Sequence, residues 1–194
     1  MEPFTTLHAV ALPIDLPNVD TDQIIPARFL GKPRPMQVSA LFHDLRAKPD
    51  FVANQPGFAG AKIIVAERNF ACGSSRENAV TVMMDNGYRA FIAPSFGDIF
   101  FNNCFQNGAL PIRLDTGRVG EILAALHARP GAEVTIDLAN QTVTGPDGKT
   151  DRFDIDPFRK DCLLKGVDEI NMTLGYDADI TRFEDRHRQD MSWL

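Results

Sequence analysis

The segment AKIIVAERNFACGSSRE, residues 61–77, decides the fold of this chain. Its first six residues are nearly all apolar and predict a buried strand, and the polar residues after Gly73 predict a helix that runs through Met84. A short strand at 89–93 and a helix at 96–106 are predicted next, so the middle of the chain is expected to be a β-α-β-α unit. A strand at 110–114 and a helix at 117–128 are predicted after it.

The flanking segments predict more strands around this unit. A strand at 7–14 leads into a polar loop at 15–22, a Gly- and Pro-containing loop is expected at 31–35, and one short helix at 38–46. The later elements are a strand at 134–138, an antiparallel hairpin of 141–143 and 152–155, and helices at 157–165 and 179–188. These patterns predict a single α/β domain over 1–194. We expect a mixed sheet or partly closed β-barrel that is flanked by helices, with a helical C-terminal extension over about 157–194.

Composition and charge exclude several classes of function. The chain has 194 residues, 20 Lys plus Arg and 26 Asp plus Glu, with a net charge of -6. This sign is wrong for a protein that binds nucleic acid or anionic membranes, and no apolar run approaches the roughly 18 residues of a membrane span. Residues 1–6 carry no signal-peptide pattern, so we expect a cytoplasmic protein. The three cysteines, Cys72, Cys104 and Cys162, are too scattered to predict a disulfide framework or a metal site.

The junction of the strand and helix in residues 61–77 predicts a site for an anion. The first N–H groups of a helix lack partners and face the positive end of its dipole. Ser74 and Ser75 add hydroxyl groups, and Arg76 adds a guanidinium whose planar fork suits a carboxylate. In this setting one of the two serines could act as a base. The alternative is a structural capping box, because Ser74 and Glu77 have the spacing of one.

Two more polar segments are candidates for the same site. In NVDTDQIIP, residues 18–26, Asp22 could orient an arginine or receive a proton, whereas the structural alternative is an Asx turn that caps the next element. In APSFGDIFFNN, residues 93–103, Ser95 and Asp98 have the spacing of a helix cap, and the phenylalanines suit a core stripe. We interpret this last segment as structural.

Together these segments resemble one known family, the small subunits of 3-isopropylmalate dehydratase, which are similar to the swivelling C-terminal domain of aconitase. The resemblance covers nearly the whole chain. It rests on four segments in the order of that family, namely VDTDQIIPARFL (19–30), NFACGSSRE (69–77), APSFGDIFFNNCFQNGALPI (93–112) and FDIDPFRKDCLLKGVDEINMTL (153–174). The fold it implies is an aconitase-like swivel domain.

The resemblance also implies half of an active site. In that family a separate large subunit carries a [4Fe–4S] cluster with one open iron, so this chain is expected to bind no metal itself. Ser74 resembles the base that removes a proton from the substrate carbon, and Ser75 and Arg76 resemble the partners of the substrate carboxylate. Thr21 and Asp22 resemble the loop that completes the pocket. The implied reaction converts 2-isopropylmalate to 3-isopropylmalate through an unsaturated diacid, in leucine biosynthesis.

Two departures from the family pattern bear on the substrate. Asn78 stands where the family usually has His, and the loop that contains Leu30, Gly31, Lys32 and Arg34 lacks the usual Thr and Gly pattern of a possible specificity loop. A related diacid, such as a methylmalate with citraconate as its dehydrated form, therefore stays an alternative. Two further functions also stay open, a non-catalytic carboxylate-binding module and a serine hydrolase, although no histidine partner for a catalytic serine is evident.

Overall fold

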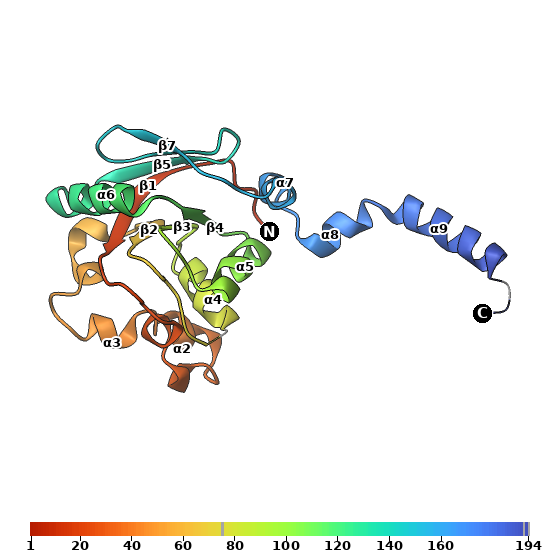
Figure 1. Cartoon of the computed structure of the whole chain (residues 1–194). Coiled ribbons are helices and arrows are strands. Elements are labelled where there is room, and N and C mark those ends of the chain that lie inside the picture. Colours follow the sequence, from red (N-terminus) through yellow and green to blue (C-terminus); the bar gives the residue numbers. More distant parts are fainter. Residues whose placement is uncertain (75, 192, 194) are drawn as a thin grey trace.

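A computed structural model describes residues 1–74, 76–191 and 193, and its centre is one seven-stranded mixed sheet (Figure 1). The strands are β1 (Thr6–Ile14), β2 (Ile63–Ala66), β3 (Ala90–Ala93), β4 (Leu110–Arg113), β5 (Glu133–Asp137), β6 (Thr142–Thr144) and β7 (Thr150–Arg152). Their order is β4-β3-β2-β1-β5-β6-β7, with β1 to β4 parallel and β5 to β7 antiparallel. The prediction of a mixed sheet flanked by helices is confirmed.

Helices cover both faces of the parallel strands. Helices α4 (Glu77–Asp85) and α5 (Asp98–Asn107) pack on one face, and α6 (Thr116–Ala128) packs on the other. Successive side chains of a strand point to opposite faces, so Ile64 joins the α4 and α5 core while Ile63 and Val65 join the α6 core. Strands buried on both faces are continuously apolar, which explains the pattern that predicts β2 from the sequence.

The segment between β1 and β2 differs from its prediction. It forms α1 (Thr21–Ile24), α2 (Arg34–Val38) and α3 (His43–Arg46), so the single helix expected at 38–46 is wrong. The helix is interrupted at Phe42, whose φ of 54° is left-handed. This conformation buries the Phe42 ring completely and lets its N–H donate to the Ile24 carbonyl at 2.8 Å. A tertiary contact thus outweighs the local helical pattern.

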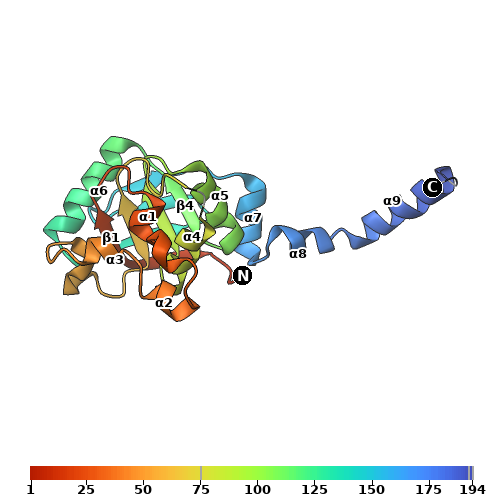
Figure 2. The same cartoon turned by 90° about the horizontal axis from the view of Figure 1, so that it is seen from below.

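The C-terminal part divides after Gly166. Helix α7 (Pro157–Lys165) packs on the body through the buried Leu163 and ends at Gly166, which has a φ of 68°. Helices α8 (Glu169–Leu174), which was not predicted, and α9 (Asp177–Asp190) then extend away from the body (Figures 1 and 2). Across residues 1–74, 76–191 and 193, no helix is long and apolar enough to cross a membrane.

Candidate active site

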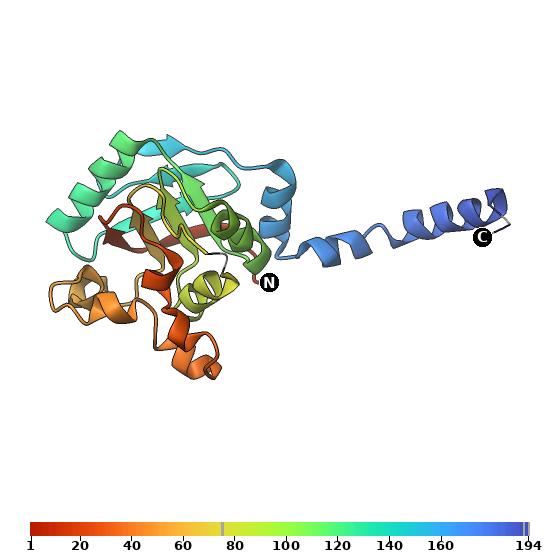
Figure 3. The ribbon, with the colours of Figure 1, turned by 60° about the horizontal axis from the view of Figure 1, so that its bottom comes forward.

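The loops that follow the parallel strands meet at the carboxyl edge of the sheet. The N–H of Cys72 donates to the Val19 carbonyl at 3.2 Å, which joins the loops after β1 and β2. The N–H of Phe70 donates to the Ser95 carbonyl at 3.0 Å, which joins the loops after β2 and β3. Open α/β sheets bind their ligands at this edge, and helices α1, α4 and α5 surround it here (Figure 3).

Ser74 does not cap a helix. Helix α4 begins three residues later, at Glu77, and its N-cap residue Arg76 makes no side-chain cap hydrogen bond. The Glu77 carboxylate instead accepts a hydrogen bond from Asn107 of α5 at 3.1 Å. The capping-box alternative is therefore wrong, because the contact between α4 and α5 takes the glutamate. Ser74 is exposed, in the bend that follows Cys72.

A capping box does exist nearby, in the loop after β1. The Asp20 carboxylate accepts from the Gln23 N–H at 2.8 Å, and the Gln23 side chain accepts from the Asp20 N–H at 2.9 Å. The structural alternative for residues 18–26, a turn that caps the next element, is therefore found at Asp20. The next two residues, Thr21 and Asp22, point their side chains to the segment that contains Ser74.

Thr21 supports the backbone at Ser74. Its side chain is only 3% exposed, and its hydroxyl donates to the Ser74 carbonyl at 3.0 Å. Its backbone N–H donates to the Cys72 carbonyl, also at 3.0 Å. Between these two anchors lies Gly73, whose φ of 90° is left-handed and is easily reached by glycine. The turn that presents Ser74 is thus clamped from the loop after β1.

Asp22 holds the Arg76 guanidinium in one orientation. The two carboxylate oxygens of Asp22 accept from the two terminal nitrogens of Arg76 at 2.6 and 2.8 Å. One of these nitrogens also donates to the Ile25 carbonyl at 3.4 Å. The hydrogen bond from Arg76, helped by one from the Ala27 N–H, lowers the pKa of Asp22 below its usual value. Arg76 is 13% exposed, so its charge is largely enclosed yet open at one side.

Thr21, Ser74 and Arg76 line a pocket of about 390 Å³, whereas Asp22, which pairs with Arg76, is not among its lining residues. It is lined by Thr21, Asn69, Ala71, Cys72, Gly73, Ser74, Arg76, Phe96, Gly97, Asp98, Ile99 and Phe100. Ser74 and Arg76 are therefore brought together in one cavity, as the sequence predicts. Ser75, predicted beside them, lies outside the described residues.

The first turn of α5 lines the same pocket, in a segment that the sequence pattern predicts to be structural only. The helix is preceded by Gly97, so Ser95 and Asp98 do not cap it; the Ser95 hydroxyl accepts from the Asn69 N–H at 2.8 Å instead. A Cβ at Gly97 would lie 2.4 Å from the Ala71 carbonyl oxygen, so only glycine allows this approach. No side chain caps the N–H groups of this first turn, which favours an anion in the pocket, whereas the Asp98 carboxylate in the same turn opposes one. The position of these N–H groups after a strand of the parallel sheet could have indicated this role.

Backbone strain is concentrated at the same place. Non-glycine residues with a positive φ include Asn18 at 57°, Asn69 at 59° and Ala71 at 55°, and all three lie in the joined loops. The Asn69 side chain donates to that of Asn18 at 2.9 Å. A left-handed alanine costs roughly 1–2 kcal/mol and persists where surrounding contacts compensate, which is typical of functional sites.

The predicted specificity loop lies outside the pocket that contains Ser74. None of Leu30, Gly31, Lys32 and Arg34 is among the residues that line the pocket. Arg34 pairs with Asp85 of α4 at 2.6 Å and donates to the Thr81 hydroxyl at 3.0 Å. Its guanidinium is therefore engaged with α4 in this conformation. A role of the loop in substrate choice stays a prediction.

The described residues do not combine into a metal site. Cys72 borders the pocket, and burial together with the Asp20 charge raises its pKa. Cys104 is buried in α5 and Cys162 in α7. Within residues 1–74, 76–191 and 193, no three His, Cys, Asp or Glu side chains converge as ligands.

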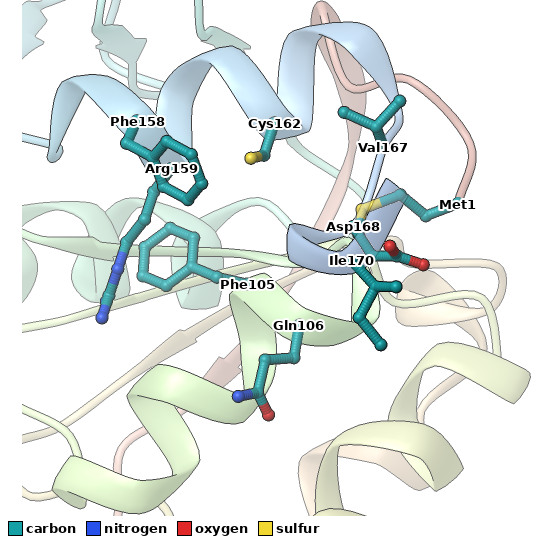
Figure 4. Close-up of a pocket in the computed structure, with 9 residues that line it drawn as sticks. All are labelled: Met1, Phe105, Gln106, Phe158, Arg159, Cys162, Val167, Asp168 and Ile170. Carbon is teal, nitrogen blue, oxygen red and sulfur yellow. The ribbon is translucent and has the colours of Figure 1, made fainter. Parts of the chain in front are cut away.

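A second hollow, of about 300 Å³, lies between α5 and the start of the C-terminal arm (Figure 4). Its polar side chains have structural tasks. Arg159 lies over the Phe105 ring and donates to Asn102 at 2.8 Å, and Asp168 caps α8 by accepting from the Asn171 N–H at 2.7 Å. The pocket that contains Ser74 is thus the better candidate for an active site.

The fold and this pocket define an aconitase-type C-terminal domain. The family model described as Aconitase C-terminal domain matches residues 1–117, and a second model, LeuD_N, matches residues 121–157. The chain belongs to the family of 3-isopropylmalate dehydratase small subunits, and the resemblance seen in the sequence is confirmed.

Three similar proteins support this assignment. Small subunits of 3-isopropylmalate dehydratase from Paramagnetospirillum magneticum and Leptospira interrogans are 48% and 47% identical to this chain. Each alignment covers the whole of this chain and 100% and 98% of the relative. A solved 3-isopropylmalate dehydratase structure from Methanocaldococcus jannaschii has a TM-score of 0.69 at 26% identity, and covers 91% of this chain and 98% of its own.

Proposed function

We propose that this chain is the small subunit of a hydro-lyase that converts 2-isopropylmalate to 3-isopropylmalate in leucine biosynthesis, in the cytoplasm. Family membership supports the reaction. The observation that supports the proposal is that Ser74 and Arg76 line one pocket together with the first turn of α5. A hydroxyl, an oriented guanidinium and free N–H groups suit a substrate that has two carboxylates and a proton to be removed.

Each of these groups has a separate task in the proposed mechanism. Arg76, fixed by Asp22, binds one substrate carboxylate, and the N–H groups at the start of α5 attract negative charge in the same cavity. Ser74 takes a proton from the carbon next to the one that bears the hydroxyl. The electron pair of the broken C–H bond forms the double bond of an unsaturated diacid, and the hydroxyl departs with the electron pair of its C–O bond and becomes water by taking up one proton. Water then adds with the opposite orientation, which returns the proton to carbon and gives the isomer.

The chain supplies only part of this chemistry. Ser74 is exposed and its pocket is open, so the site is expected to close against another surface. The residues described here do not form a set that fits a metal cluster, and no step is assigned to one on this chain. In this proposal the [4Fe–4S] cluster and the loss of the hydroxyl belong to a large subunit, paired with this chain as the name of its relatives implies.

The test is a Ser74→Ala variant assembled with the large subunit. Turnover of 2-isopropylmalate is expected to fall by about 10²–10⁴-fold, the usual range for loss of a general base. Ser39→Ala is the matched control, because the Ser39 hydroxyl donates to the Met36 carbonyl in α2, outside the pocket. Near-normal turnover of the Ser74 variant, with an intact heterodimer, would remove Ser74 from the mechanism. If the unmodified complex turns over citraconate faster than isopropylmalate, the assignment of isopropylmalate as the substrate is wrong.

A further inference from the structure

The chain ends in a helical arm that extends away from the body (Figures 1 and 2). The arm consists of α8 and α9, residues 169–190. All 14 residues of α9 are exposed. An isolated helix of this length is only marginally stable in water, and most helices are stabilised by the packing of one apolar face. If α9 carries such a face, that face is expected to bind another surface.

Helix α9 does carry an apolar face. Ile180 and Phe183 are 40% and 58% exposed, and Tyr176 and Met191 extend the same line at 57% and 38%. Successive members of this set are three, four or eight positions apart, so the four side chains share one side of the helix. We call these four residues the arm stripe. Exposed apolar surface of this kind is typical of a site that binds a protein or a membrane.

The charge of the arm disfavours two kinds of partner. Helix α9 has five acidic side chains and three arginines, and Arg182 and Arg188 pair with carboxylates of the same helix. Helices that lie on anionic membranes are instead rich in Lys and Arg on their polar face. The rest of the chain carries the larger part of the net charge of -6, so a second copy would meet the arm with charge of the same sign. The arm therefore suits an apolar groove with a basic rim on a different protein.

Helix α5 connects the surroundings of the pocket with the start of the arm. Its first turn lines the pocket that contains Ser74, and Ile99 in this turn is 49% exposed. Its last turn contains Phe105, which lines the second hollow together with Ile170 of α8 (Figure 4). Helix α5 has 10 residues and is therefore roughly 15 Å long. A protein that covers the open pocket can thus also reach the arm.

The start of the arm is fixed to the body. The N-terminal amine of Met1 donates to the carbonyl of Gly166, the residue at which α7 ends, at 3.0 Å. Gly166 has a left-handed φ of 68°, and a Cβ there would lie 2.7 Å from Pro3. The N-terminal segment and this glycine thus set the direction in which the arm leaves the body. Binding of the arm to a partner would therefore also hold the body beside that partner.

We infer that the arm stripe binds an apolar groove with a basic rim on the large subunit and so holds this chain in the heterodimer. The inference rests on the proposed function, because that function supplies the partner. The relatives that are named small subunits align with the whole of this chain, the arm included. The arm stripe is not among the residues that line the Ser74 pocket, so it contributes to affinity and not to the chemistry.

The test compares two matched double variants of the full chain. Ile180→Gln with Phe183→Gln makes the arm stripe polar. Ala178→Gln with Thr181→Gln is the control, because it places two glutamines, again three positions apart, on another side of α9. Glutamine is a good helix former, so neither variant is expected to unfold this exposed helix, which circular dichroism checks.

The affinity of each variant for the large subunit is measured by titration calorimetry. The stripe variant should raise Kd by about tenfold to a hundredfold, as expected for the loss of anchor side chains, and the control should stay within about twofold. At a saturating concentration of the stripe variant, kcat for isopropylmalate should equal that of the unmodified complex. An unchanged Kd, an equal rise of Kd in the control, or a kcat that stays low at saturation would overturn the inference.

The basic rim is tested by Asp177→Asn, three positions before Ile180 and beside the arm stripe. Its association with the large subunit at low salt should be about threefold slower, because charges at the rim of an interface act mainly on the association rate. Asp185→Asn, on the far side of α9, is the control and should associate at a rate close to that of the unmodified chain. Equal rates for the two variants would overturn the basic rim.

Two further results separate the inference from its alternatives. If sedimentation shows that the unmodified small subunit alone is a dimer and that the stripe variant is a monomer, the arm stripe binds a second copy and the inference is wrong. If the unmodified complex forms but does not convert isopropylmalate, the proposed function is wrong, while the Kd values still decide the role of the arm.

Discussion

The hydroxyl of Thr21 donates to the backbone carbonyl of Ser74 at 3.0 Å, although the two residues are 53 positions apart in the sequence. The contact connects the loop after β1 with the loop after β2. The position of Ser74, the proposed base, therefore depends on the buried Thr21 side chain of another loop. The neighbouring pair, Asp22 and Arg76, does the same for the proposed carboxylate-binding residue.

Removal of the Thr21 hydroxyl should therefore affect Ser74. Thr21→Val is expected to lower the free energy of unfolding by about 1 kcal/mol, the value of one hydrogen bond. It should lower kcat by about tenfold or more, because a small displacement of a reacting group is costly. Thr21→Ser keeps the hydroxyl and should stay close to the unmodified protein. Equal kcat values for the valine and serine variants would show that this contact does not position Ser74.

Arg76→Lys tests the planar fork. A lysine keeps the charge but cannot bind Asp22 through two nitrogens and still orient a donor towards a carboxylate. We expect KM to rise by about tenfold or more, since a charge-assisted hydrogen bond is worth roughly 1.5–3 kcal/mol. Arg28→Lys is the control, because Arg28 makes a comparable two-nitrogen pair with Asp44 away from the pocket. If both variants keep the KM of the unmodified complex, Arg76 does not bind substrate.

Gly97→Ala tests the close approach of α5 to the loop after β2. The added Cβ would meet the Ala71 carbonyl oxygen at 2.4 Å, so the backbone must move. The free energy of unfolding should fall by about 1–3 kcal/mol, the usual cost of overpacking. Gly120→Ala in α6 has open space around it and should instead raise this free energy by about 0.5–1 kcal/mol. Urea unfolding of both variants measures the difference, and a stabilised Gly97→Ala would contradict the geometry.

The turn between β6 and β7 should give a pH-dependent stability. Asp147 accepts from two nitrogens of Arg118 in α6, one of them at 2.6 Å, and this lowers the pKa of Asp147 to about 2. A lowered pKa contributes stability above the unfolded value near 3.8, and this is lost as the pH falls towards about 2.

Asp147→Asn should accordingly be less stable than the unmodified chain by about 1–2 kcal/mol at pH 7, with the gap closing between about pH 4 and pH 2. Urea unfolding at a series of pH values measures this gap. Asp50→Asn is the control, since Asp50 is exposed and forms no ion pair with any residue that the structure describes. A gap that stays constant down to pH 3 would contradict the lowered pKa of Asp147.

Prediction from the sequence succeeded where local pattern and tertiary structure agree. The strand expected at 61–66 is found as β2, and the helix expected at 157–165 is found as α7, because an apolar run and a helix-ending glycine predict the same structure in most surroundings. It failed at the helix expected over 38–46 and at the capping box expected from Ser74. The Phe42 N–H donates to the Ile24 carbonyl, and the Glu77 carboxylate accepts from Asn107. Each group thus bonds to a residue distant in the sequence and not to the local partner that the pattern predicts.

By itself, the sequence determined the alternation of strands and helices, the polar segments after the strands and the family to which the chain belongs. These features depend on residue type and short spacing. The tertiary structure alone decided that Asp22 pairs with Arg76 and that the start of α5 lines the same pocket as Ser74. Contacts of this kind join residues about 20 to 50 positions apart, and only the packing of loops at one edge of a parallel sheet brings them together.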